Sequence, residues 1–317
     1  MLRAERNPVS DEVARELRDA LGRRQKELPA RWLAAVDANT LRDGARSLLG
    51  HEHESTECEL GLAVLRDKLA DARPRGVVCI QPSASSANLT LADELCHRGS
   101  VLSIAATELD PKLAVEMLER IASRGICELS SAVVCDLTLD LPLAENFPRP
   151  RVYLCLGNVL GTFTPVGAVR LLRILRTTMS PSDSIVLGLD APEHTTIRSL
   201  PDDQFDVAAS RHLGALGLIN TTAGAGFDLS RFDFRPTFDA ENNRVETHLV
   251  ARRALDVEVP GICAIRLKKG ESIRTSVRCA FDRNRIAAMM AGVGLALRDW
   301  TTDADGRYVV ALATPAV

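Results

Sequence analysis

The stretch Val152–Pro165, VYLCLGNVLGTFTP, indicates both how the chain folds and where it binds a ligand. An apolar run of strand length ends at Gly157, a second glycine follows at Gly161, and a helical pattern begins after the last proline. In open α/β sheets, ligands bind where strands end at their carboxyl edge and the chain turns toward a helix. Glycines at such a turn let the backbone approach a ligand closely. We call residues 157–162 the floor loop and predict that they form the floor of a ligand site.

Short β-branched apolar runs alternate with helical patterns on either side of the floor loop. Such alternation is typical of a mainly parallel sheet with helices on both faces. We therefore predict a core of five parallel strands. The strand-like runs are GVVCIQP from Gly76, VLSIAATEL from Val101, SAVVCDL from Ser131, VYLCLG from Val152 and SIVLGLD from Ser184. The helical patterns between them end at His97 or span Pro111–Ser123 and Val166–Thr178.

The segments that flank this core have other patterns. Helices are predicted at Asp11–Arg24, Glu57–Ala72, Asp203–Ile219 and Asp282–Gly292, and long strand-like runs begin at Arg244 and Cys263. Asp305-Gly306 lies between two further strand-like runs and is typical of a hairpin turn. We predict an N-terminal helical segment (1–72) that contributes to a smaller α+β substrate domain (192–281), a Rossmann-like core (73–191), and a C-terminal helix and hairpin (282–317) that complete the core.

The composition is that of a soluble globular protein, with 46% hydrophobic and 26% charged residues among 317. A formal net charge of −3 argues against a broad nucleic-acid footprint, which would show as a basic patch. No apolar run reaches the roughly 18 residues that a membrane-spanning helix needs. We expect a cytoplasmic protein whose partner is a small molecule rather than nucleic acid or membrane, and the sequence leaves monomer and homodimer open.

Cysteine and histidine spacing favours no metal site. The eight cysteines form no C-x-x-C pair, and several lie within apolar runs, which is typical of buried thiols in a reducing compartment. Cys79, Cys135 and Cys155 lie near predicted strand ends, so a reactive thiol at one of them stays an alternative. His51 and His53 lie in an acidic stretch that is more typical of a surface than of a metal centre.

The order of the predicted elements resembles that of Rossmann-like, class I S-adenosylmethionine-dependent methyltransferases, whose parallel core also ends in an antiparallel hairpin. This resemblance implies a cofactor that lies across the carboxyl ends of the first strands. Glu108, at the end of the second strand, would accept hydrogen bonds from the ribose hydroxyls. Asp136, with Leu137 beside it, would contact the adenine. The alternatives are a solvated acid at Glu108 and an Asx turn at Asp136.

The turn after the first strand departs from that class. Glycines are usual there, yet no glycine occurs between Gly76 and Gly99, and Pro82 restricts the backbone. We therefore expect the usual cofactor cradle to be altered or lost. The remaining candidates for cofactor contacts are Gln81, Ser83 and Ser85, although a serine in this position also serves to cap the following helix.

Several long segments resemble the histidine-specific N-methyltransferases of ergothioneine biosynthesis. They are LGNVLGTFTP from Leu156, the stretch from Asp202 to Arg253, GESIRTSVRCAF from Gly270 and LRDWTTDADGRYVVALATP from Leu297, with KELPARW from Lys26 as a weaker likeness. The family holds the imidazole with a glutamate and a serine, and these positions are Ser276 and Arg278 here. Its backbone-holding asparagine is Thr162 here. Its tyrosines are absent at Ala34, around His53-Glu54 and at Pro201.

The changed positions predict an acceptor other than histidine. Replacing a carboxylate by Ser276 and adding Arg278 reverses the charge, which favours a carboxylate or a neutral polar group. Arg211 and His212 lie in the same block and are candidates for the same anion site, as is Arg274. The alternative is that the arginines pair with nearby glutamates on a solvated face.

The resemblance implies an enzyme that methylates a small amino-acid-like acceptor, at nitrogen, in specialised metabolism. In this interpretation Gly157, Asn158 and Thr162 of the floor loop lie between cofactor and acceptor. A noncatalytic binding or scaffold subunit is the first alternative, because cofactor and acceptor positions have changed together. A nicotinamide-dependent oxidoreductase is the second, although the glycine fingerprint of that class is missing.

Overall fold

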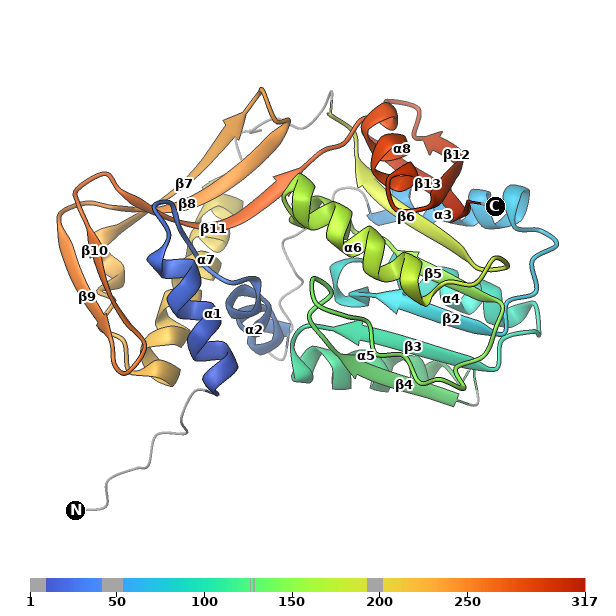
Figure 1. Cartoon of the computed structure of the whole chain (residues 1–317), viewed down its shortest axis with the longest axis horizontal. Coiled ribbons are helices and arrows are strands. Elements are labelled where there is room, and N and C mark those ends of the chain that lie inside the picture. The colour runs from blue at the N-terminus through green and yellow to red at the C-terminus, as the bar shows by residue number, and fades with distance from the viewer. Residues whose placement is uncertain (1–9, 42–53, 126, 128, 193–201, 317) are drawn as a thin grey trace, which may run out of the picture. The chain divides into compact units, whose positions relative to one another are not determined.

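The computed structural model describes residues 10–41, 54–125, 127, 129–192 and 202–316 (Figure 1). The chain divides into two compact units. The smaller unit consists of Met1–Leu48, Ile197–Ala240 and Val245–Val277, and the larger unit of Leu49–Thr196, Glu241–Arg244 and Arg278–Val317. Among the described residues, no helix has the length and apolar character needed to cross a membrane.

The larger unit is built on a seven-stranded sheet with the order β12-β13-β6-β5-β2-β3-β4. The five strands β2 to β6 are parallel, whereas β13 pairs with β6 and with β12 in antiparallel register. The predicted α/β fold, with a five-stranded parallel core and a C-terminal hairpin, is therefore confirmed. The strands are β2 (Gly76–Ile80), β3 (Ser103–Glu108), β4 (Leu129–Val134), β5 (Arg151–Cys155), β6 (Ser184–Asp190), β12 (Leu295–Thr302) and β13 (Tyr308–Pro315).

Helices cover both faces of this sheet, with α3, α4 and α5 on one face and α6 and α8 on the other (Figure 1). Local sequence explains where they begin and end. Asp110 accepts hydrogen bonds from the first backbone amides of α5, and Gly125 ends that helix with a left-handed φ of 65°. Thr164 caps α6 in the same way. The helices are α3 (Glu54–Lys68), α4 (Ala87–His97), α5 (Pro111–Arg124), α6 (Pro165–Thr178) and α8 (Arg283–Ala291).

The core of the larger unit is aliphatic and continuous across the sheet. All five residues of β2 and of β5 are buried, as expected for central parallel strands that helices cover on both faces. Val64 and Leu65 of α3 belong to this core. The helix α3 therefore packs within the larger unit, whereas the sequence grouped residues 1–72 with the substrate domain.

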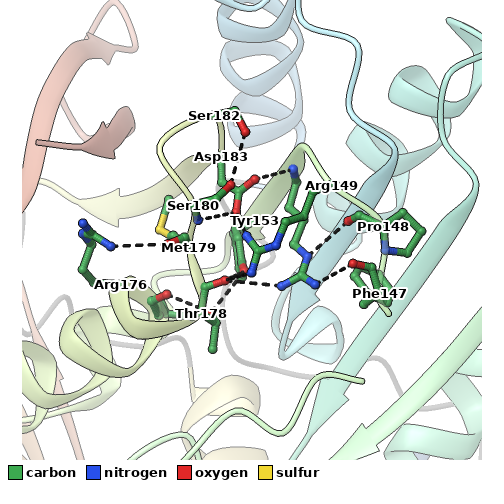
Figure 2. A network of polar contacts seen from close by, with 12 residues as sticks. Phe147, Pro148, Arg149, Tyr153, Arg176, Thr178, Met179, Ser180, Ser182 and Asp183 are labelled. Atoms are coloured by element: carbon green, nitrogen blue, oxygen red, sulfur yellow. Dashed lines mark hydrogen bonds and ion pairs between the residues drawn. The ribbon is translucent and has the colours of Figure 1, made fainter. Parts of the chain in front are cut away.

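A polar network closes the amino-terminal ends of β5 and β6 (Figure 2). Asp183 is fully buried and accepts hydrogen bonds from the backbone amides of Arg151 at 2.7 Å and of Ser180 at 2.8 Å. It also pairs with the guanidinium of Arg149 at 2.5 Å. The hydroxyl of Tyr153 donates to the Thr178 carbonyl at 3.0 Å. Because this network lies at the opposite end of β5 from the floor loop, it supports the sheet and not the site.

Asp183→Asn should destabilise the larger unit by about 2 kcal/mol, because one buried backbone donor loses its acceptor. Urea unfolding followed by the fluorescence of Trp300, on β12, would measure this change in a Trp32→Phe background that removes the signal of the smaller unit. Binding of ligands at the carboxyl end of the sheet should be unchanged. A variant as stable as the parent would show that Asp183 contributes no net stabilisation.

The smaller unit contains a four-stranded sheet with the order β1-β11-β8-β7, a two-stranded sheet of β9 and β10, and three helices among its described residues. Its core surrounds Leu17, Trp32, Leu216 and Leu249. The elements are α1 (Asp11–Gly22), β1 (Lys26–Glu27), α2 (Ala30–Leu41), α7 (Asp202–Ala223), β7 (Phe232–Asp239), β8 (Arg244–Ala251), β9 (Leu255–Val259), β10 (Cys263–Leu267) and β11 (Ser272–Cys279).

The sequence patterns predicted fewer of the elements of the smaller unit than of the larger unit. Each of the two long strand-like runs is broken by a turn, so that they form four strands, β8 to β11. The strands β1 and β7 and the helix α2 were not predicted. Helix α1 begins as predicted, with the Ser10 hydroxyl accepting from the backbone amide of Val13.

Candidate functional site

The floor loop follows β5 and turns sharply through two left-handed residues. Gly157 has a φ of 83° and Asn158 a φ of 52°, after which a 3-10 turn covers Val159–Thr162. A Cβ atom at Gly157 would lie 2.7 Å from the carbonyl oxygen of Ala84. The close approach that the glycine permits is therefore to the backbone of the turn after β2. The floor loop and that turn touch directly.

The side chain of Asn158 is buried beneath the rest of the floor loop. Its Nδ2 donates to the Asp190 carboxylate at 2.7 Å, while its Oδ1 is a buried acceptor with no hydrogen-bond partner among the described residues. A Cβ atom at Gly161 would lie within 3.0 Å of both the Asn158 side-chain amide and the Cys279 carbonyl oxygen. Asn158 thus anchors the loop to the end of β6 through its Nδ2, and its place between cofactor and acceptor stays a prediction.

Thr162 stands at the other end of the floor loop and is exposed. Its hydroxyl donates to the Val159 carbonyl at 2.7 Å, which closes the 3-10 turn. One lone-pair face of that oxygen stays available to a ligand. Of the three predicted catalytic positions, the structure therefore leaves Thr162 in an open position and uses Gly157 and Asn158 for the shape of the loop.

The turn after β2, residues 81–86, which we call the cofactor turn, forms without glycine. Gln81 itself takes the left-handed conformation, with a φ of 46°, and its backbone amide donates to the Thr107 carbonyl at 2.9 Å. Such a conformation costs a residue with a side chain on the order of 1 kcal/mol. The Ser85 hydroxyl accepts from the backbone amide of Ala87, the first residue of α4, at 3.2 Å, whereas Ser86 at the N-cap position makes no side-chain capping bond.

Glu108 and Asp136 occupy the ends of neighbouring strands, as predicted, but their environments differ. Glu108 is buried at the end of β3 and accepts from the Ser83 backbone amide at 2.8 Å. Burial raises the pKa of Glu108 to about 7. Asp136 accepts from the amide and the hydroxyl of Thr138 at 2.8 and 2.7 Å, which is the Asx turn that the sequence left open. Leu137 is buried beside it.

Glu57, on α3, is a buried acid that sequence patterns did not reveal. Its carboxylate accepts from the Ser85 hydroxyl at 2.5 Å, from the Gly157 amide at 2.6 Å and from the Tyr308 hydroxyl. These partners are 28, 100 and 251 residues away along the chain. An acid in the first turn of a helix is usually a solvated one, so no local signal distinguishes this residue.

The predicted anion-binding arginines are paired with acids of their own unit. In the larger unit, Arg278 forms a two-pronged ion pair with Asp190, with Nη2 to Oδ1 at 3.0 Å. In the smaller unit, Arg211 forms a similar pair with Asp37 at 2.5 and 2.6 Å. Arg274 pairs with Glu27 and Glu246. These ion pairs largely neutralise the positive charge that was predicted for the acceptor site. The alternative that glutamates pair with Arg274 is confirmed.

Ser276 and His212 do not supply charge either. Ser276, on β11, is half-buried. His212 is buried on α7 with its ring 5.1 Å from that of Phe234. Burial lowers the pKa of His212 to about 3, so the ring is neutral at physiological pH. Neither a neutral His212 nor Arg211, which is paired with Asp37, supplies the net positive charge that the predicted anion site needs.

Burial also raises the pKa of the strand-end cysteines, which disfavours the reactive thiolate form. Cys79, Cys135 and Cys155 are buried, and burial raises the pKa of the Cys155 thiol to about 12. In the described part of the chain, no group of three or more histidine, cysteine or acidic side chains is placed to hold a metal ion. His51 and His53 lie outside the described residues.

The strand order is that of the Rossmann-like fold of class I S-adenosylmethionine-dependent methyltransferases. The fold is shared with the CcbJ methyltransferase from Streptomyces caelestis (TM-score 0.50, 16% identity, 82% of this chain and 94% of that one). It is also shared with an S-adenosylmethionine-dependent methyltransferase from Clostridium acetobutylicum (TM-score 0.50, 9% identity, 82% and 92%).

More narrowly, the chain belongs to the family of histidine-specific, S-adenosylmethionine-dependent methyltransferases, whose model matches residues 114–315. It is 25% identical over 308 residues to a histidine N-alpha-methyltransferase of Mycolicibacterium smegmatis, covering 96% of this chain and 95% of the relative. It is 26% identical over 304 residues to a histidine N-alpha-methyltransferase of Mycobacterium tuberculosis, covering 95% and 94%. The protein is a methyltransferase, and its cofactor is S-adenosylmethionine.

The residues at the carboxyl edge fit this cofactor. Glu108 presents a buried carboxyl group at the strand end where ribose hydroxyls would need acceptors, and Gly157 leaves no Cβ between the floor loop and the cofactor turn. The unpartnered Oδ1 of Asn158 is a further buried acceptor at the same edge. The turn that lacks the usual glycines has Gln81 in a left-handed conformation, and its Ser83 backbone amide donates to Glu108.

Proposed function

We propose that the protein methylates the amino nitrogen of a small amino-acid-like acceptor that is not histidine and whose side chain is uncharged. The observation that carries this proposal is the chemistry of positions 276 and 278. The resemblance assigns imidazole binding to a glutamate and a serine at these positions, and this chain has a serine and an arginine. Without the glutamate, an imidazole loses its charged hydrogen-bond partner.

The ion pair of Arg278 narrows the acceptor further. Asp190 neutralises the Arg278 guanidinium, so an acceptor with an anionic side chain gains little binding energy from Arg278. An acceptor with a cationic side chain finds the Asp190 carboxylate already paired. A neutral side chain is therefore favoured over both charged classes.

The chain's own residues need only hold the acceptor and exclude water. S-adenosylmethionine supplies a methyl group that its sulfonium sulfur already activates. Leu156, Val159 and Leu160 are fully buried around the floor loop and provide a dry base for it. Rate acceleration then comes mainly from aligning the acceptor nitrogen and keeping water away.

A panel of amino acids tests the proposal directly. Purified protein and S-adenosylmethionine would be incubated with histidine, arginine, glutamate, glutamine, leucine, phenylalanine, tyrosine and tryptophan, and the methylated products would be quantified by mass spectrometry. We expect kcat/KM for the best neutral acceptor to exceed that for histidine by about tenfold or more, the discrimination a site achieves when a polar group lacks its partner. Preferred methylation of histidine or of a charged amino acid would refute the proposal.

A reciprocal double variant tests the two positions themselves. Ser276→Glu combined with Arg278→Ser restores the family's residues and should shift the ratio of histidine to neutral acceptor by about tenfold toward histidine. Arg283→Ser is the matched control, because it removes an exposed arginine of the same unit at the start of α8. An unchanged ratio in the double variant would remove positions 276 and 278 from acceptor selection.

A further inference from the structure

The carboxyl group of Glu57 lies where four segments of the larger unit meet. One oxygen, Oε2, accepts from Ser85 in the cofactor turn at 2.5 Å. The other, Oε1, accepts from the backbone amide of Gly157 in the floor loop at 2.6 Å, and from the hydroxyl of Tyr308 on β13. A single side chain on α3 therefore joins the two loops that form the carboxyl edge of the site.

The sheet makes room for this carboxyl group. Gly188 is buried in the middle of β6, and a Cβ there would lie within 3.0 Å of both Glu57 Oε1 and the Tyr308 hydroxyl. A buried strand normally carries a side chain at such a position, because glycine weakens a strand interior. The absence of a side chain at position 188 therefore leaves space for the Glu57 carboxyl group, which indicates that the surrounding structure is adapted to this acid.

The environment of Glu57 is polar. Among the described residues, no lysine or arginine pairs with its carboxylate, and burial raises its pKa. The three donors are neutral, and they offset part of the cost of burying a charge. Replacing this acid by an apolar residue would remove the acceptor of these three donors, so Glu57 also contributes to stability. Stability alone does not decide the role of Glu57, and its contacts with both loops favour a role at the site.

We propose that Glu57 is a positioning residue that fixes the cofactor turn against the floor loop and thereby sets the affinity for the cofactor. The cofactor turn lacks the glycines that would let it follow a ligand, and Gln81 holds it in a left-handed conformation. The contact between Ala84 and Gly157 leaves little room for relative movement of the two loops. Glu57 locks both loops at once, through Ser85 and through the Gly157 amide. The proposal rests on S-adenosylmethionine as cofactor and not on the identity of the acceptor.

Calorimetric titration of S-adenosylhomocysteine tests this role without any acceptor. Glu57→Gln keeps the shape of the side chain but turns one acceptor into a donor that faces either Ser85 or Gly157. We expect its Kd to rise by about tenfold, which corresponds to ~1.4 kcal/mol. Ser85→Ala should raise Kd in the same direction. The double variant should bind no more than about twofold worse than Glu57→Gln alone, since both changes break one contact.

Tyr153→Phe separates positioning from stability. It removes a buried tyrosine hydroxyl from the same sheet, at the end remote from the floor loop, where that hydroxyl contacts Thr178 (Figure 2). This variant should lower the urea midpoint and leave Kd unchanged. If Ser85→Ala and Glu57→Gln also shift only the midpoint, the positioning role is overturned. If Glu57→Gln does not fold, the Kd and the urea midpoint of Ser85→Ala alone test the positioning role. A loss of cofactor affinity would stand whatever acceptor the enzyme uses.

Discussion

Gly157→Ala is expected to lower the rate of methyl transfer by about 100-fold, the loss that a misplacement of about 1 Å can cause in an active site. The new Cβ would lie 2.7 Å from the Ala84 carbonyl oxygen and 2.8 Å from its carbon, and both are backbone atoms that cannot rotate away. The floor loop and the cofactor turn must then move apart. The left-handed φ of 83° adds a smaller strain of its own.

A second glycine provides the control for Gly157→Ala. Gly125 has a similar φ of 65° at the end of α5, but a Cβ there would meet no atom within 4 Å. Gly125→Ala therefore has the conformational cost without the collision, and it should lose about 1 kcal/mol of stability with full activity. Activity and the Kd of S-adenosylhomocysteine would be measured for both variants. Equal losses of activity in the two would show that contact with Ala84 is not what requires Gly157.

Gly188→Ala should have the largest effect on stability, about 3 kcal/mol, which is the upper part of the range for overpacking a core. The added methyl group would displace the Glu57 carboxyl group or the Tyr308 hydroxyl, and each displacement also breaks hydrogen bonds at a buried position. The free energy of unfolding would be followed through Trp300 in urea, again in the Trp32→Phe background. We expect cofactor affinity to fall together with stability.

Two further variants identify the cause of that loss. Gly292→Ala, at the end of α8, places its Cβ no closer than 3.4 Å to any atom and should change stability by less than about 0.5 kcal/mol. Tyr308→Phe added to Gly188→Ala removes one of the two colliding oxygens and should recover part of the loss. If the double variant is no more stable than Gly188→Ala, Tyr308 is not part of the collision.

The sequence was sufficient for the parallel core because its signals are local. Apolar strands such as residues 76–80 alternate with capped helices, and each signal is contained in fewer than twenty residues. The acids at strand ends, Glu108 and Asp136, could be placed for the same reason. The family resemblance then supplied the cofactor, which no spacing in the chain would have identified.

The rest depended on contacts between distant residues. Nothing near Glu57 distinguishes it from a surface acid, and its burial becomes visible only when Ser85, Gly157 and Tyr308 are brought together. The charge of Arg278 was misjudged because its partner, Asp190, lies 88 residues away. In the smaller unit, β1 is two residues long and pairs with a strand near the other end of the chain, so no pattern in the sequence reveals it.

That pairing has a consequence for how the protein is made. Lys26 of β1 lies beside Ile273 of β11, so the first strand to leave the ribosome has no neighbour until most of the chain has been translated. The five parallel strands of the larger unit, at residues 76–190, have all been translated long before then. Domains generally fold as units during synthesis. The amino-terminal segment, which includes Leu17 and Trp32, therefore cannot complete its own hydrophobic core while the parallel strands of the larger unit form. A chain interrupted before residue 273 would contain the five parallel strands, but neither β11 of the smaller unit nor the antiparallel strands β12 and β13 that complete the sheet of the larger unit.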